Sequence, residues 1–290
     1  MAKHIKLDHR KLSAEINTAN GQLVSFMCNG IEYMHDGGIS SYSGPGWGNS
    51  EVVPFPIFGP ADNQEVKVGK NKYSLEQHGI SRHTAENPFK PVKQKKKSAI
   101  SLVQKYDGRK ISNPKYKPGN GHPEKLYWLP YTLEKVFELT NEGLSCQLII
   151  TNDSDSEMPF MIGWHPAFKV FGSVDEGEFI NEEGVCLATL QEVINQSAIP
   201  PEEALTIKGL YSVSYRNKNT GKGVKVSSKN FSENIMLWSP SEEAGMLCIE
   251  HTSQLPVYDE QNYFGEPKDF ELLAPGEKRI YSIEVIPLAD

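Results

Sequence analysis

Two adjacent stretches near the middle of the chain alternate between apolar and polar residues with a period of two. In Tyr131–Leu139 the odd positions are Tyr, Leu, Lys, Phe and Leu, and the even positions are Thr, Glu, Val and Glu. Leu144–Thr151 alternates similarly after a turn at Asn141–Gly143. Such alternation is typical of strands with one buried face, and Asn and Gly favour the turn between them. The sequence therefore predicts an antiparallel hairpin, with Lys135 and Val136 as exceptions to its pattern.

Short apolar runs bounded by Gly, Pro or Asn predict further strands along the rest of the chain. These runs are 23–28, 99–106, 224–227, 235–238, 245–250 and 280–286. We expect one short helix, Pro200–Leu205, because its first turn holds proline and acids and Gly209 lies beyond its end. Many short strands without a repeat or a low-complexity linker are typical of a large antiparallel sandwich or barrel. The sequence thus predicts an all-β chain with a single domain over residues 1–290.

The charge balance and the missing motifs argue against several classes of partner and cofactor. The chain has 30 Lys and Arg against 37 Asp and Glu, a formal net charge of −7, whereas nucleic-acid binding requires a basic surface. No run of about 18 apolar residues could span a bilayer and no amino-terminal stretch resembles a signal peptide, so we expect a cytoplasmic protein without a membrane partner. The four cysteines form no C-x-x-C pair, and the Walker A, G-x-G-x-x-G and G-x-S-x-G motifs are missing. We expect reduced thiols, no metal and no cofactor.

Two ionisable residues stand at the ends of strongly apolar runs. His165 follows the run Met158–Trp164, and Glu250 follows Gly245–Ile249, where it shares a strand face with Met246 and Cys248. A buried charge is costly unless it is paired or used, and burial would raise the pKa of a glutamate towards the range of a general base. The alternatives are a histidine satisfied by a backbone carbonyl and a glutamate that caps its strand at the surface.

A second polar group surrounds a glycine in the segment His78–Arg82. His78 and Arg82 offer hydrogen-bond donors to a polar ligand, and Gly79 allows a turn or a close approach. The alternatives are a surface loop with an Arg–acid pair and a zinc site of His78 with His83, which has no suggestive third ligand nearby. Trp238 and Trp47 are candidates for the walls of a pocket or for the core.

Four sequence landmarks occur in an order that resembles the aldose 1-epimerase family, the galactose mutarotase-like proteins. They are Pro54–Pro60, His78–Arg82, the segment from Asn152 to Phe168 with its His-Pro-Ala-Phe motif, and Leu247–Glu250 followed by Leu273–Glu277. The resemblance spans roughly residues 12 to 287. It implies a large antiparallel two-layer β-sandwich, the galactose mutarotase-like supersandwich, and a cofactor-independent isomerase that interconverts the α and β anomers of a monosaccharide.

The same resemblance implies roles for individual residues. Glu250 would take the proton of the anomeric hydroxyl as base, while His165 would protonate the ring oxygen as acid. His78 and Arg82 would hold sugar hydroxyl groups, beside Trp238. We expect the Glu250 carboxylate to keep His165 protonated. The partner would be a small-molecule sugar, and the protein a monomer or a homodimer.

Two alternative functions stay open. A hexose-6-phosphate 1-epimerase would carry Arg-Gly-Gly before the Phe-Pro motif, but this chain has Gly48–Ser50 there, without an arginine. The Asn-Arg-Ile and Gly-Asp-His segments of galactose-type members are also missing from the sequence. A carbohydrate-binding or sensing protein without catalysis could use the same fold. Convergence of His165 and Glu250 to within reach of one pyranose would favour catalysis over binding alone.

Overall fold

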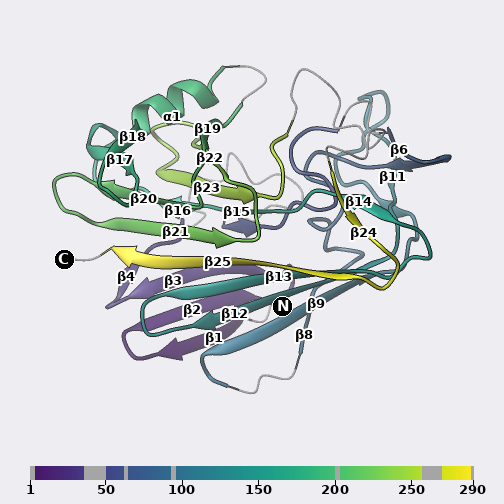
Figure 1. The fold of residues 1–290 in the computed structure, drawn as a ribbon, viewed down its shortest axis with the longest axis horizontal. Helices are drawn as coiled ribbons and strands as arrows, with labels where there is room; N and C mark the ends of the chain where they lie inside the picture. The colour runs from purple at the N-terminus through teal and green to yellow at the C-terminus, as the bar shows by residue number, and fades with distance from the viewer. Residues whose placement is uncertain are drawn as a thin grey trace.

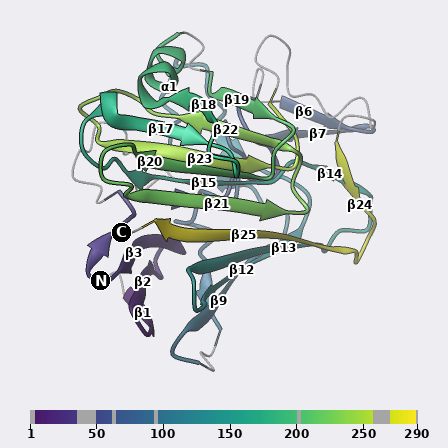
Figure 2. The ribbon, with the colours of Figure 1, turned by 60° about the vertical axis from the view of Figure 1, so that its left-hand side comes forward.

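The computed structural model describes residues 4–35, 50–61, 65–92, 96–199, 203–256 and 270–288. Its largest element is a nine-stranded antiparallel sheet. In spatial order the strands are β18 (Cys186–Thr189), β17 (Gly177–Ile180), β20 (Ser212–Asn217), β21 (Gly223–Lys229), β25 (Lys278–Leu288), β13 (Leu144–Asn152), β12 (Tyr131–Leu139), β9 (Ala99–Tyr106) and β8 (Lys90–Pro91). In Figure 2 β21 and β25 run side by side at the middle of this sheet, as their pairing requires.

A six-stranded sheet carries most of the candidate site residues. Its strands are β19 (Leu205–Lys208), β22 (Asn234–Trp238), β23 (Met246–Thr252), β15 (Gly163–Pro166) and β5 (Glu51–Val52), with β16 (Phe168–Lys169) paired to β23. Figure 1 shows β22, β23 and β15 above the strands β25, β13 and β12 of the larger sheet. The described residues therefore form an all-β architecture of antiparallel sheets, as the sequence predicts.

Smaller sheets complete the described part of the fold. They are β1 (His4–His9), β2 (Leu12–Asn17), β3 (Gln22–Cys28) and β4 (Ile31–Glu32); β6 (Glu65–Val68) with β7 (Asn71–Ser74); β10 (Ile111–Ser112) with β11 (Lys125–Leu126); and β14 (Met158–Phe160) with β24 (Glu271–Leu273). No helix in the described ranges is long and apolar enough to cross a membrane.

The predicted hairpin is confirmed and its exception has a physical cause. β12 and β13 pair from Tyr131↔Asn152 to Leu139↔Leu144, and every odd position of β12 is buried, including Lys135. The Lys135 ammonium donates to both carboxylate oxygens of Glu51 in β5, at 2.8 and 3.2 Å. Lys135 can therefore point inward like the other odd residues of β12, because a buried acid on the other sheet balances its charge.

The helix prediction is wrong. Residues 200–202 lie outside the described residues, Glu203 and Ala204 are not helical, and Leu205 begins β19. The helix α1 spans Leu190–Ser197 instead, and a 3₁₀ turn, η3, covers Val174–Glu176. A capping box starts α1: the Glu192 amide donates to the Thr189 hydroxyl, and the Thr189 amide donates to the Glu192 carboxylate. The Thr-x-x-Glu signal therefore begins eleven residues before the proline pair.

Candidate functional site

The register of two strands brings His165 and Glu250 together. β15 pairs antiparallel with β23 through Gly163↔Thr252 and Trp164↔His251, so the next position sets His165 beside Glu250. The Nε2 of His165 lies 3.5 Å from the Oε1 of Glu250. Both residues are buried, at 6% and 3% exposure. Residues 85 positions apart in sequence thus form one close acid–base pair.

The same face of β23 holds an apolar border for this pair. Cys248 lies two residues before Glu250 and opposite Trp238 of β22. It packs in a small apolar cluster with Ala167, Met246 and the partly buried Trp238. The Trp238 ring centroid lies 6.2 Å from that of His165, in an edge-on arrangement. Trp238 therefore lies beside the pair, where the sequence analysis expected an aromatic wall.

A tight loop presents His78 to His165. His78 and Gly79 both have positive φ, 63° and 74°, and a Cβ at residue 79 would meet the carbonyl oxygen of Phe55 at 2.1 Å. Only glycine fits this close approach. The Gly59 amide donates to Nδ1 of His78 at 3.1 Å, so the neutral ring carries its proton on Nε2. The rings of His78 and His165 lie 5.6 Å apart, edge to face.

Burial controls the charges of the pair, and one expectation about them is wrong. Burial raises the pKa of Glu250 to about 8. Burial, together with the nearby Arg82 guanidinium, lowers the pKa of His165 to about 3. At neutral pH the pair therefore rests as a carboxylic acid beside a neutral imidazole. The carboxylate does not keep His165 protonated, because both ionised forms lose more from desolvation than a 3.5 Å contact returns.

Arg82 is buried close to this pair. It is 8% exposed, and burial lowers its pKa to about 10, so it stays cationic. Its charge also helps to lower the pKa of His78, after burial itself. Arg82 borders a hollow of about 270 Å³, together with His83 and the segment 84–86. The alternative of a surface loop does not hold for Arg82, because its side chain is buried.

The residues that could hold a metal ion differ from His78 and His83, the zinc ligands considered from the sequence. Within the described ranges, one group of three potential ligands is close enough to hold an ion: His165, Cys248 and Glu250. His78 and His83 do not belong to it. Cys248 was not predicted as a polar member of the site, although its two-residue spacing from Glu250 can be read from the sequence.

A buried network behind β15 was also missed. Glu51 accepts hydrogen bonds from the Trp164 indole at 3.1 Å and from the Leu23 amide at 3.2 Å, in addition to Lys135. It therefore ties the residue before His165 to β12 of the nine-stranded sheet. The sequence shows Lys135 at a position where the strand pattern predicts an apolar residue, but no sequence pattern identifies Glu51 as its partner.

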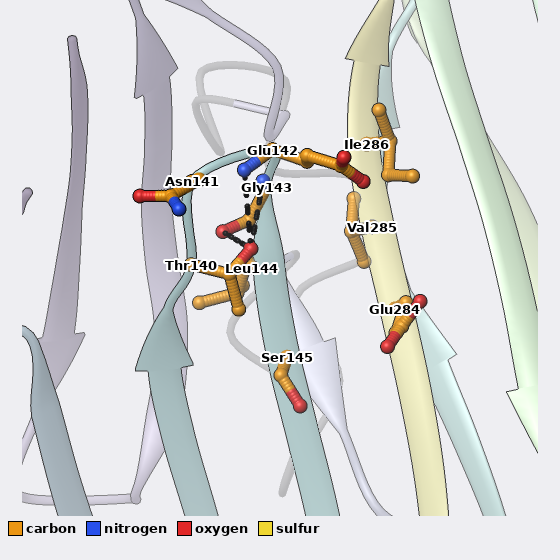
Figure 3. Close-up of a pocket in the computed structure, with 9 residues that line it drawn as sticks. All are labelled: Thr140, Asn141, Glu142, Gly143, Leu144, Ser145, Glu284, Val285 and Ile286. Atoms are coloured by element: carbon orange, nitrogen blue, oxygen red, sulfur yellow. Dashed lines mark hydrogen bonds between the residues drawn. The ribbon is translucent and has the colours of Figure 1, made fainter. Parts of the chain in front are cut away.

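Another hollow contains none of the predicted site residues. It encloses about 300 Å³ beside the turn of the β12–β13 hairpin. Figure 3 shows its lining from Thr140–Ser145 and Glu284–Ile286. The acids there have no cationic partner in the lining, and we assign this hollow no role.

Comparison with known proteins agrees with the arrangement of the sheets and with the sequence landmarks. The sequence profile of the family described as aldose 1-epimerase matches residues 3–209. The chain belongs to the aldose 1-epimerase family. Among curated relatives, the protein LacX (chromosomal) of Lactococcus lactis subsp. lactis is 24% identical over 295 residues, covering 91% of this chain and 92% of its own.

Solved structures show that the fold is that of the galactose mutarotase-like proteins. A galactose mutarotase-like protein from Lactobacillus casei superposes with a TM-score of 0.74 at 18% identity, over 98% of this chain and 100% of its own. A galactose mutarotase related enzyme from Lactobacillus acidophilus gives 0.75 at 17% identity, over 99% of both chains. At these identities the likeness establishes the fold, while residue roles depend on the site itself.

Proposed function

We propose that this protein is an aldose 1-epimerase that interconverts the α and β anomers of a monosaccharide. The observation that carries the proposal is the 3.5 Å approach of His165 Nε2 to Glu250 Oε1 on one face of the six-stranded sheet. Membership of the aldose 1-epimerase family supports the same reaction class. We further propose that residues 1–290 act as one domain and that the substrate is a small sugar.

The reaction requires one acid and one base on the same sugar. A base removes the proton of the anomeric hydroxyl while an acid protonates the ring oxygen, and the C1–ring oxygen bond breaks. Rotation of the resulting aldehyde and reclosure of the ring give the other anomer. The two proton transfers reverse on closure, so the enzyme ends in its starting protonation state. Positioned groups of this kind contribute about 10²–10⁴-fold each.

The pair of His165 and Glu250 holds one proton at neutral pH, and that proton suffices for the reaction. With a pKa of about 8 for Glu250 and about 3 for His165, the proton rests on the carboxyl group. Glu250 acts as base and His165 as acid only after this proton has moved to the imidazole. Sugar hydroxyl groups that donate to the Glu250 carboxylate would favour that form, because hydrogen bonds stabilise the ionised carboxylate. Binding of the sugar thus prepares the pair.

The neighbouring side chains suit a polyol. His78 has a neutral ring with an Nε2–H donor, because Nδ1 accepts from Gly59. The buried Arg82 guanidinium offers further donors, and the ring of Trp238 offers a flat apolar surface for the C–H groups of a pyranose. We propose that these three residues orient the sugar against the pair of His165 and Glu250, so that each group reaches one oxygen on C1.

The decisive experiment measures anomer exchange with saturation-transfer NMR. A panel of aldoses and aldose phosphates is tested with the wild type and with Glu250→Gln, which should lose about 10²–10⁴-fold of the acceleration. Glu242→Gln changes an exposed acid of the turn before β23 and should keep wild-type rates. Acceleration by Glu250→Gln equal to that of the wild type would falsify the assignment. A sugar that binds without faster exchange would instead identify a carbohydrate-binding protein.

A further inference from the structure

The face of β23 that carries Glu250 also carries a thiol. Cys248 precedes Glu250 by two residues, so both side chains leave the strand on the same side. One ligand atom each from Cys248, His165 and Glu250 lie within 4.8 Å of one another. All three residues are buried. We propose that they form a zinc-binding site, through which Zn²⁺ reversibly blocks the acid–base pair.

The spacing of the three donors suits tetrahedral zinc. Bonds of about 2.0–2.3 Å to nitrogen, oxygen and sulfur place neighbouring donors about 3.3–3.7 Å apart. The Nε2–Oε1 separation of His165 and Glu250, 3.5 Å, already lies in this range. Since no separation in the group exceeds 4.8 Å, the Cys248 sulfur has to approach the other two donors by about 1.5 Å at most, which rotations of the ligand side chains can provide. Three protein ligands leave the fourth position to water.

The chemistry of the donors selects the ion. Imidazole, thiolate and carboxylate are the three ligand types that zinc takes in proteins, whereas magnesium and calcium prefer oxygen alone. One thiolate and one carboxylate balance the two positive charges of zinc, so the loaded site is neutral. Neutrality matters here because a net charge at a buried position is costly. It also removes repulsion from the Arg82 cation, whose charge acts on His165.

Zinc at this position would occupy both groups that the proposed function assigns to proton transfer. The inhibitory part of the inference therefore rests on the proposed function. Binding of the ion does not rest on it, because it can be measured without any sugar. The experiment separates these two parts.

Binding is measured by titrating zinc chloride into the full chain in competition with a chromophoric zinc indicator. Cys248→Ala should weaken zinc binding by at least about tenfold, since even loss of a group that supports a metal ligand costs that much. Cys186→Ala removes an exposed cysteine in β18 and should leave the affinity unchanged. Cobalt(II) should give a thiolate-to-cobalt charge-transfer band in the wild type and in Cys186→Ala, but not in Cys248→Ala.

Inhibition is measured on any sugar whose anomer exchange the protein accelerates. Micromolar zinc should slow the wild type and Cys186→Ala, a chelator should restore the rate, and Cys248→Ala should need at least about tenfold more zinc. Equal zinc affinity of wild type and Cys248→Ala, or a cobalt spectrum without a thiolate band, would overturn the site. Zinc that binds through Cys248 without slowing exchange would overturn the inhibition. If no sugar is turned over, the titration and the cobalt spectrum still decide the site, so the two proposals fail separately.

Discussion

Replacement of Lys135 by methionine should destabilise the protein by about 3–5 kcal/mol, because Glu51 would stay buried without its counter-charge. Lys135 and Glu51 have side chains 1% and 0% exposed, joined at 2.8 Å between Nζ and Oε2. The lysine Nζ also lies over the rings of Phe89 and Phe137, at 4.9 and 5.5 Å from their centroids. Methionine keeps apolar contact with these rings, so the expected loss is electrostatic and does not come from a cavity.

A double variant separates the unpaired charge from other effects of the substitution. Glutamine at position 51 carries no charge, and its one carbonyl oxygen can accept from either the Trp164 indole or the Leu23 amide, which donate to different oxygens of Glu51. Lys135→Met combined with Glu51→Gln should therefore be more stable than Lys135→Met alone. This order follows because an unpaired buried charge costs more than a pair replaced by neutral groups.

The assay is urea unfolding followed by circular dichroism. The slope of the unfolding free energy against urea concentration is compared between the variants, because an unchanged slope means that only the stability has changed. Lys96→Met is the matched control, because it breaks the pair of Lys96 with Glu138 at the far end of β12, where the side chains are 68% and 43% exposed. That variant should lose less than about 1 kcal/mol. A loss below about 1 kcal/mol for Lys135→Met, or a double variant no more stable than the single one, would refute the reasoning.

Two further predictions concern the site. The kcat/KM of anomer exchange, measured with chelator present, should be constant at neutral pH and fall about tenfold per pH unit above about pH 8. Above this pH Glu250 loses the only proton that the pair of His165 and Glu250 holds. A kcat/KM that stays constant up to pH 10 would contradict this. Gly79→Ala should raise KM by displacing His78 and lower the melting temperature, because its Cβ would meet the Phe55 oxygen at 2.1 Å. Gly69→Ala, also at positive φ but with open space around its Cβ, should cost only about 1–2 kcal/mol and leave KM unchanged.

Local patterns in the sequence predicted the strands well. Six runs and both arms of the hairpin fall on strands of the structure, and β9 and β12 have the predicted bounds. Period-two alternation succeeds for β9, β12 and β13 because each of them packs one face on the core. The helix prediction failed because Leu205 begins β19, which pairs with β22. The helix α1 lies earlier in the chain, where the capping box at Thr189 starts it and the buried side chains of Leu190, Val193 and Ile194 anchor it.

What the sequence could not supply were long-range partners and the effects of desolvation. Lys135 and Glu51 are 84 positions apart, and no local pattern connects them. The protonation of the pair depends on how completely His165 and Glu250 lose water. The sequence predicted that burial raises the pKa of Glu250, but the effect of burial on the pKa of His165 was not anticipated. Because desolvation lowers the pKa of His165 more than the nearby carboxyl group can raise it, the expected imidazolium is not the resting form.

Strand parity explains why Glu250, and not its neighbour, belongs to the site. Glu250 and His251 are adjacent, ionisable and buried in a strand whose seven residues are all buried, so burial alone does not distinguish them. Adjacent residues of a strand point to opposite faces. His251 pairs with Trp164, and its ring lies 6.2 Å from that of Phe231 in the core, while Glu250 faces His165. If the pairing of β15 with β23 slipped by one residue, Glu250 and His251 would exchange places, and a histidine would stand beside His165 where the carboxyl group is required. The buried bonds of Glu51 to Trp164 and Lys135 hold β15 against that slip, so the core network and the site chemistry depend on the same register.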